Sequence, residues 1–381
     1  MWSSLIRPQK WLALAAFLAL VAGLWAALLR LGWNLPWLQP KLAVAHGPLM
    51  VGGFLGTLIG LERAVALGRR WAYWAPALTA LGGAVLVVGL PGLIGPLLIF
   101  LGSVVLIAVF CVIIQRQRAM FTATMAAGAV AWTVGNALWL GGIPIPEMVH
   151  WWMAFLILTI VGERLELSRL LPPTANRAKL FALAVAIYVA GLVATSFNIP
   201  IGRWFLGLGM VALAAWLARY DIARFTVRQR GLPRFAAVCL LSGYAWLAVG
   251  GVLAILYGRW PSNAEMAYDA MLHAVFLGFV FSMIFAHAPI ILPSVTRLRL
   301  SYSPVFYVYF LLLELSLLWR ISGDCLGLSG AYRWGGLFNV VAILLFLAST
   351  GRSLLIGARN PQPIVHAAPR HEEQHCPSIP R

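Results

Sequence analysis

Histidines within long apolar runs are the residues of this chain best suited to chemistry. Four of the seven histidines, His46, His150, His273 and His287, lie in such runs or at their ends. An ionisable side chain at membrane depth is costly, so each one is a functional-site hypothesis. Neutral imidazole is also a common metal ligand. The sequence therefore points first to metal or cofactor binding by histidines from different helices.

Three of these histidines are expected at one depth. His46 and His150 lie near the starts of their apolar runs, and His273 lies about six residues into its own. At a rise of 1.5 Å per residue, all three should lie within roughly 10 Å of one membrane face. Two facing imidazoles can provide both axial ligands of a haem, and three can hold copper or zinc. Asp269, one turn before His273, is the expected partner of that imidazole or of a haem propionate.

A second polar layer lies on the same three runs, about 20–24 Å deeper by the helical rise. We name it the inner polar cluster. Its members are Glu62, Arg63, Glu163, Arg164, Glu166 and His287. At 100° per residue, His273 and His287 share one stripe of their helix. Such a cluster could conduct protons or bind a second metal.

Structural roles explain some of these residues equally well. A single membrane histidine can be a hydrogen-bonded packing residue, and His150, which follows Glu147, can be interfacial. The Glu-Arg pairs can be mutually neutralised ion pairs at the headgroup level. Glu314 lies midway through another apolar run, where it could serve a proton path or a hydrogen bond between helices. The residue types alone do not choose between these roles.

The composition excludes a soluble enzyme. Hydrophobic residues make up 62% of the 381 residues and charged residues only 10%, whereas soluble domains carry about 25% charged residues. The net charge of +17 is spread between apolar runs rather than gathered in one patch, so we expect no nucleic-acid partner. The expected surroundings are membrane lipid.

The apolar runs predict an all-α polytopic membrane protein with twelve transmembrane helices. The predicted spans are residues 11–31, 42–62, 73–91, 94–115, 119–141, 148–168, 179–197, 202–220, 234–257, 267–293, 304–321 and 334–356. The connections on one side, with the two termini, carry 22 of the 28 Lys and Arg residues, and the other side carries 6. Because positive residues stay on the cytoplasmic side, both termini are predicted to be cytoplasmic in a cell inner (plasma) membrane. We expect one transmembrane domain over 1–357 and a disordered cytoplasmic tail over 358–381.

Two segments resemble helices of haem-copper oxidase subunit I. The stretch 46–76 is similar to its second helix through His46, Gly47, Met50, Gly60, Leu67, Gly68 and Pro76. The stretch 269–293 is similar to its tenth helix. The closer resemblance is to the NnrS-like family of haem- and copper-containing membrane proteins linked to nitric oxide response, through Asp269, Ala270 and His273. The resemblance implies a haem-copper oxidase subunit I-like bundle in which His46 and His273 ligate a haem, with copper as a further candidate.

The chain also departs from the oxidase pattern. Oxidase helix 10 carries His-x-His, whereas only His273 is present here, and the predicted seventh span lacks the oxidase histidine pair for copper. The ligands of a binuclear centre are thus incomplete, which leaves open whether the chain is an enzyme. With no Cys-x-x-Cys-His motif, any haem would be b-type and non-covalent.

The sequence therefore predicts a membrane haem or metal protein with a bis-histidine site near the outer face. We expect redox chemistry or a nitric oxide or oxygen response, with a small gas or redox partner. The alternative is a secondary transporter or channel for a small solute or proton that uses the inner polar cluster. A membrane enzyme acting on lipid would need an Asp-rich motif that is missing, and a structural assembly subunit is a further alternative.

Overall fold

The computed structural model describes residues 8–36, 38–170, 176–256, 264–296 and 302–359, and every regular element in these ranges is helical. The first half contains α1 (Pro8–Arg30), η1 (Ala43–Ala45), α2 (His46–Pro48), η2 (Leu49–Gly56), α3 (Thr57–Leu67), η3 (Arg70–Tyr73), α4 (Trp74–Val88), α5 (Ile94–Arg116), α6 (Met120–Leu140), α7 (Ile145–Leu167) and η4 (Ser168–Leu170). The second half contains α8 (Arg177–Thr195), α9 (Ile199–Tyr220), α10 (Ala223–Thr226), α11 (Leu232–Leu256), α12 (Ala264–His273), η6 (Ala274–Phe281), α13 (Ser282–Thr296), α14 (Phe306–Leu326) and α15 (Ser329–Arg359). Of the predicted tail, 358–381, the first two residues belong to the end of α15, and residues 360–381 lie outside the described residues.

Long apolar helices dominate because a chain surrounded by lipid must satisfy its backbone hydrogen bonds within each segment. Eleven helices in the described ranges are long and apolar enough to cross a membrane, which is compatible with a polytopic membrane protein. The predicted fifth span is α6, a helix of 21 residues that is not among the eleven. Several helices stop at a glycine in the left-handed conformation, such as Gly68 after α3 and Gly89 after α4.

The three spans that carry most of the predicted site residues are also the most buried. In the most apolar 18-residue stretch of each helix, the share of buried residues is 78% for Glu265–Pro289, 72% for Ile145–Leu167 and 67% for Ala43–Leu67. In the other membrane-spanning candidates it is 56% or less. Several polar residues on these spans are buried or half-buried within the protein, among them His46, His150, Arg164 and His273. This is the position expected of functional polar groups in a membrane bundle.

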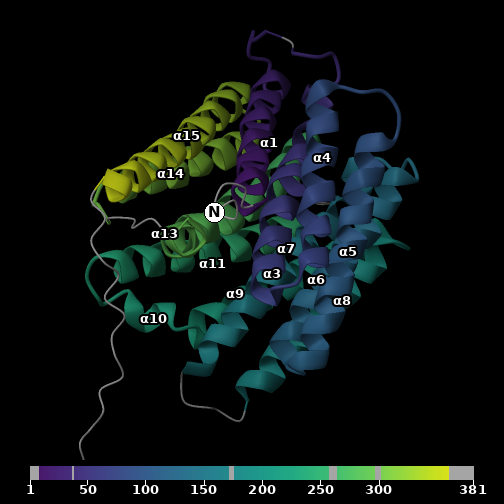
Figure 1. Cartoon of the computed structure of the whole chain (residues 1–381). Helices are drawn as coiled ribbons and strands as arrows, with labels where there is room; N and C mark the ends of the chain where they lie inside the picture. Colours follow the sequence, from purple (N-terminus) through teal and green to yellow (C-terminus); the bar gives the residue numbers. More distant parts are fainter. Residues whose placement is uncertain (1–7, 37, 171–175, 257–263, 297–301, 360–381) are drawn as a thin grey trace, which may run out of the picture.

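The other helices surround these three. In Figure 1, α14 and α15 lie side by side next to α1, and α4 and α5 lie on the other side of α1. Helix α5 contacts α4 and α6, and α6 contacts α7. Helix α11 contacts α9, η6 and α13. The continuous segment α12–η6–α13 contacts α7, α11 and α14, and so links the two sides of the bundle.

A stripe of small residues on the second span packs helices together. A Cβ added at Gly52 would lie 2.9 Å from Ile99 of α5, and one at Gly56 would lie 2.3 Å from Trp132 of α6. A Cβ at Gly60 would lie 3.3 Å from Pro76 of α4. These glycines let neighbouring helices approach closely, and none of the three lines the cavity described below.

Candidate functional site

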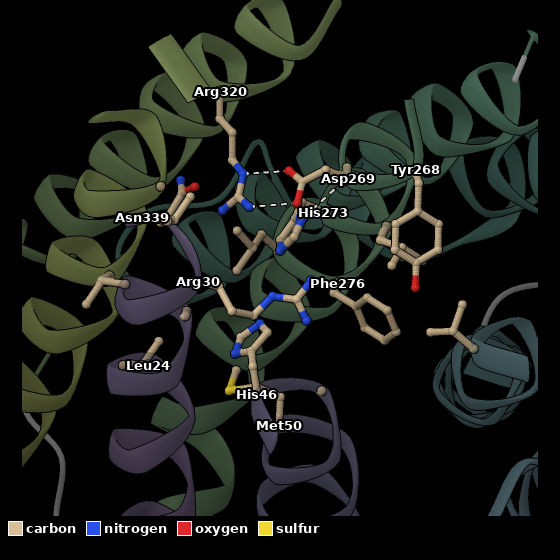
Figure 2. A pocket seen from close by; sticks show the side chains of 18 of the residues that line it. Leu24, Arg30, His46, Met50, Tyr268, Asp269, His273, Phe276, Arg320 and Asn339 are labelled. Atoms are coloured by element: carbon tan, nitrogen blue, oxygen red, sulfur yellow. Dashed lines mark hydrogen bonds and ion pairs between the residues drawn. The ribbon is translucent and has the colours of Figure 1, made fainter. Parts of the chain in front are cut away.

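A cavity of about 380 Å³ lies between α1, the His46 segment, α7, α12, η6, α14 and α15 (Figure 2). This volume falls within the range of small-molecule and cofactor sites. Its apolar walls include Met50, Val51, Leu55, Trp152, Phe276 and Phe281. Its polar lining includes Arg30, His46, Asp269, His273, Arg320 and Tyr332. The structure therefore brings both predicted axial histidines and Asp269 to one cavity.

A backbone carbonyl fixes the imidazole of His46. Nδ1 of His46 lies 2.9 Å from the carbonyl oxygen of Gly23 in α1. Because a carbonyl can only accept, this contact places the ring proton on Nδ1. Nε2 is then the unprotonated atom, the form in which imidazole binds a metal.

The imidazole of His273 is fixed in the same way and has an additional carboxylate partner. Its Nδ1 lies 2.9 Å from the backbone oxygen of Asp269 and 3.1 Å from Oδ1 of the same residue. Arg320 of α14 donates from Nε to Oδ2 and from Nη2 to Oδ1 of Asp269, both at 2.9 Å. The Arg320 guanidinium also lies over the ring of Tyr332, 5.1 Å from its centroid. His273 is thus oriented by a carboxylate that is itself clamped by a buried arginine.

Both histidines are followed by π-helical segments. The segment η2 begins three residues after His46, and η6 begins directly after His273. The two segments meet where Phe54 stacks on Phe281 with ring centroids 6.3 Å apart. π-Helical turns are rare and often occur at functional sites. Here each π-helical segment begins within three residues of a cavity histidine, and both segments contribute residues to the walls of the cavity.

Arg30 is a second cation in the cavity lining, which also includes the carboxylates of Glu265 and Asp269. Figure 2 shows its guanidinium reaching between the imidazoles of His46 and His273. Both Arg30 and His273 interact electrostatically with His46. Among the described residues, the Arg30 side chain has no hydrogen bond or ion pair, whereas Arg320 is paired. The Arg30 guanidinium therefore has its donors available to an anionic group in the cavity, beside the carboxylates that also line it.

The third outer histidine does not line the cavity. His150 is fully buried on α7, and Nε of Arg203 in α9 donates to its Nε2 at 3.3 Å. Its neighbours Val149 and Trp152 do line the cavity. Within the described ranges, no group of three or more His, Cys, Asp or Glu side chains is arranged to hold a metal ion.

The inner polar cluster forms two ion-pair groups at the other end of the same spans. Arg63 pairs with Glu163 and lies 3.5 Å from Glu62. Arg164 donates from Nε and Nη2 to the carboxylate of Asp221 at 2.8 and 2.7 Å.

The imidazole of His287 joins the second group. Nη1 of Arg164 lies 3.3 Å from Nε2 of His287, and Nδ1 of His287 lies 2.7 Å from the Met283 carbonyl. Glu166 interacts electrostatically with Arg63 and Glu163. All six predicted members of the cluster therefore lie in one region.

Three partners of these residues were not predicted from the sequence. They are Arg320, Asp221 and Arg203. Asp221 had the clearest signal, because it is the acidic residue directly after a span and precedes a connection rich in arginine. Arg320 had a weaker one, as an arginine near the end of an apolar run.

Comparison with known proteins places the chain in a family without adding a function. No curated protein matches it. No solved structure matches it. A family whose description is "Domain of unknown function (DUF8744)" matches residues 10–353, which is most of the chain. The chain therefore belongs to the DUF8744 family.

Proposed function

We propose that this protein binds a b-type haem non-covalently between His46 and His273 and takes part in redox chemistry at the outer side of the membrane. One observation carries the proposal. Two imidazoles from separate helices reach the same cavity, and a backbone carbonyl holds each Nδ1. Both Nε2 atoms are thereby prepared to act as ligands.

The rest of the cavity fits such a group. Apolar side chains form most of its walls, which suits a flat macrocycle. The guanidinium of Arg30 would have to turn from between the imidazoles toward the rim, where it would pair with a propionate. Arg30 is exposed, so this movement does not disturb the core. Haem would supply one-electron chemistry, and the chain's residues would orient the ligands and exclude water.

The arrangement favours electron transfer or sensing over gas reduction. His46 and His273 would both be engaged in holding the haem, and one-electron chemistry is what the group would supply between them. Of the two, His273 would be the more firmly oriented, because the carboxylate of Asp269 also contacts its Nδ1. If the cavity holds copper instead, His46 and His273 would be its ligands from the predicted set, since His150 lies elsewhere and the carboxylate of Asp269 is engaged by Arg320 and His273.

We further propose that the chain is a twelve-span bundle of haem-copper oxidase subunit I type in the plasma membrane, with both termini cytoplasmic. Helix α6 would be the twelfth span, because it is 21 residues long and packs between α5 and α7. The distribution of 22 and 6 positive residues between the two sides supports this orientation.

Single substitutions test the site directly. His46→Ala and His273→Ala should each remove most bound haem from protein purified after expression with ample haem. His150→Ala is the matched control, because it removes an imidazole at similar depth but outside the cavity lining. Full haem content in either of the first two variants would refute the assignment.

The alternative function is transport of a small solute or proton through the inner polar cluster. Its arginines are engaged by Glu163 and Asp221, so a pathway would require these pairs to open. Reconstituted vesicles distinguish the two proposals. A transporter shows substrate-dependent or proton flux without a chromophore, whereas the proposed haem protein is coloured.

A further inference from the structure

The connection between α9 and α11 gathers positive charge at the end of the bundle that holds the inner polar cluster. Five arginines lie between residues 219 and 234, and we name them the arginine patch. They are Arg219, Arg224, Arg228, Arg230 and Arg234. Asp221 is the only acidic residue of the sequence between Glu166 and Glu265. The patch therefore has one acidic residue nearby in the sequence.

That acidic residue is engaged elsewhere. Asp221 is completely buried, and its carboxylate accepts hydrogen bonds from Nε and Nη2 of Arg164 at 2.8 and 2.7 Å. Its Oδ1 also accepts from the backbone N–H of Ala223 at 2.7 Å. Among the described residues, no arginine of the patch forms an ion pair. The positive charge of the patch is thus available to an anion from outside the chain.

The connection is held at the level where membrane spans end. Its two flanking helices are membrane-spanning candidates, one ending at Tyr220 and the other beginning at Leu232. Between them, the short helix α10 contacts both α9 and α11 at the edge of the bundle (Figure 1). The pair of Asp221 with Arg164 ties the connection to α7, three residues before Leu167 ends that helix. These positions place the patch at the depth of lipid headgroups.

The side chains of α10 combine charge with an exposed aromatic ring. Nη1 of Arg224 donates to the carbonyl oxygen of Arg219 at 2.6 Å, and its guanidinium lies 4.7 Å from the ring centroid of Phe225. The Phe225 side chain is 47% exposed. The N–H of Arg228 donates to the carbonyl oxygen of Phe225 at 3.2 Å, which continues the helical turn beyond α10. Arg224 and Arg228, four residues apart, therefore share one face.

We propose that the arginine patch binds the phosphate headgroup of an anionic phospholipid, with Arg224 and Arg228 as its phosphate ligands. Guanidinium groups bind phosphate oxygens through paired hydrogen bonds, and clusters of positive residues beside a span attract anionic lipids. A lipid fits better than a soluble phosphate compound, because Phe225 offers an apolar contact at the level of the acyl chains. The bound lipid would cover the connection that carries Asp221, the partner of Arg164 in the inner polar cluster. The site is separate from the cavity and does not depend on haem.

Native mass spectrometry of the full-length protein in detergent tests the site. The protein is titrated with dioleoyl phosphatidylglycerol, which is anionic, or with dioleoyl phosphatidylcholine, which has no net charge. The wild-type protein should bind the first lipid more tightly by roughly tenfold or more, since each arginine beside an anionic lipid contributes roughly fivefold. The double variant Arg224→Gln with Arg228→Gln should lose most of this preference and keep its affinity for phosphatidylcholine. Equal affinity of the wild-type protein for the two lipids would overturn the proposal.

A second pair of arginines is the matched control. Arg116 and Arg118 are exposed in the connection from α5 to α6, and they lie at the same end of the bundle, because Arg169 after α7 lies over Phe121 of α6. Arg116→Gln with Arg118→Gln removes the same charge and should keep the preference for phosphatidylglycerol. An equal loss in both double variants would show a general effect of charge and overturn the proposal.

A soluble competitor distinguishes the lipid from a free phosphate compound. Glycerol phosphate carries the same phosphate without acyl chains, so a roughly hundredfold excess should leave phosphatidylglycerol bound. Displacement of the lipid by glycerol phosphate would assign the patch to a soluble ligand and overturn the proposal.

Discussion

Replacing Asp269 by Asn should weaken both the fold and the cavity site. Its carboxylate accepts two hydrogen bonds from Arg320 at 2.9 Å and lies 3.1 Å from Nδ1 of His273. The side chains of Asp269 and Arg320 are only 16% and 7% exposed. The asparagine side chain would keep the shape of the aspartate but remove its charge. The buried Arg320 guanidinium would lose the carboxylate that accepts its two hydrogen bonds and would keep only its electrostatic interaction with Asp324.

The size of the effect follows from this burial. Removing one partner of a buried ion pair costs about 3–5 kcal/mol, and the partial exposure of Asp269 favours the lower value of about 3 kcal/mol. At ~2 °C per kcal/mol, this lowers Tm by roughly 6 °C. Loss of a carboxylate that orients a metal-binding histidine typically lowers affinity 10–100-fold, which is about 1.4–2.7 kcal/mol of haem binding.

Two assays on detergent-purified protein measure these effects. Thermal unfolding followed by tryptophan fluorescence gives the change in Tm, and titration of haem-free protein with haem gives the change in affinity. Glu147→Gln is the matched control, because it removes the same charge at an exposed position and should change stability by less than about 0.5 kcal/mol. Unchanged Tm and haem affinity in Asp269→Asn would refute the role assigned to the Asp269–Arg320 pair.

Four further substitutions, in two matched pairs, test the ion pairs and the packing of the bundle. Arg164→Gln should cost about 3–5 kcal/mol, because its carboxylate partner is completely buried. Arg63→Gln, whose partners are partly exposed, should cost about 1 kcal/mol, and equal losses of Tm would contradict this ranking. Gly56→Ala places a methyl group against Trp132 and should destabilise by about 1–3 kcal/mol. Gly330→Ala meets no atom within 4 Å, and a loss of Tm there as large as at Gly56 would show that Cβ crowding is not the cause.

The helices could be predicted from the sequence because hydropathy determines which segments can lie in lipid. The predicted span 94–115, for example, corresponds to α5 over Ile94–Arg116. The grouping of His46 with His273 could be predicted because both lie near one end of their spans. Helical rise alone gives depth without any knowledge of helix order.

Contacts between helices could not be predicted, because they depend on which helices are neighbours and on their rotation. Arg203 and His150 lie on different helices, and no spacing in the sequence links them. The π-helical segments were equally unpredictable, because η2 and η6 are apolar throughout and resemble ordinary membrane helix in sequence. The twelve-span count and the haem remain predictions that await experiment.

The most direct test of the central proposal is the reduced-minus-oxidised visible spectrum of purified wild-type protein, with haem and metal analysis of the same sample. The account predicts a sharp α-band and about one haem per chain, held by His46 and His273. A colourless protein, purified after expression with ample haem supply, would contradict the account and favour transport through the inner polar cluster.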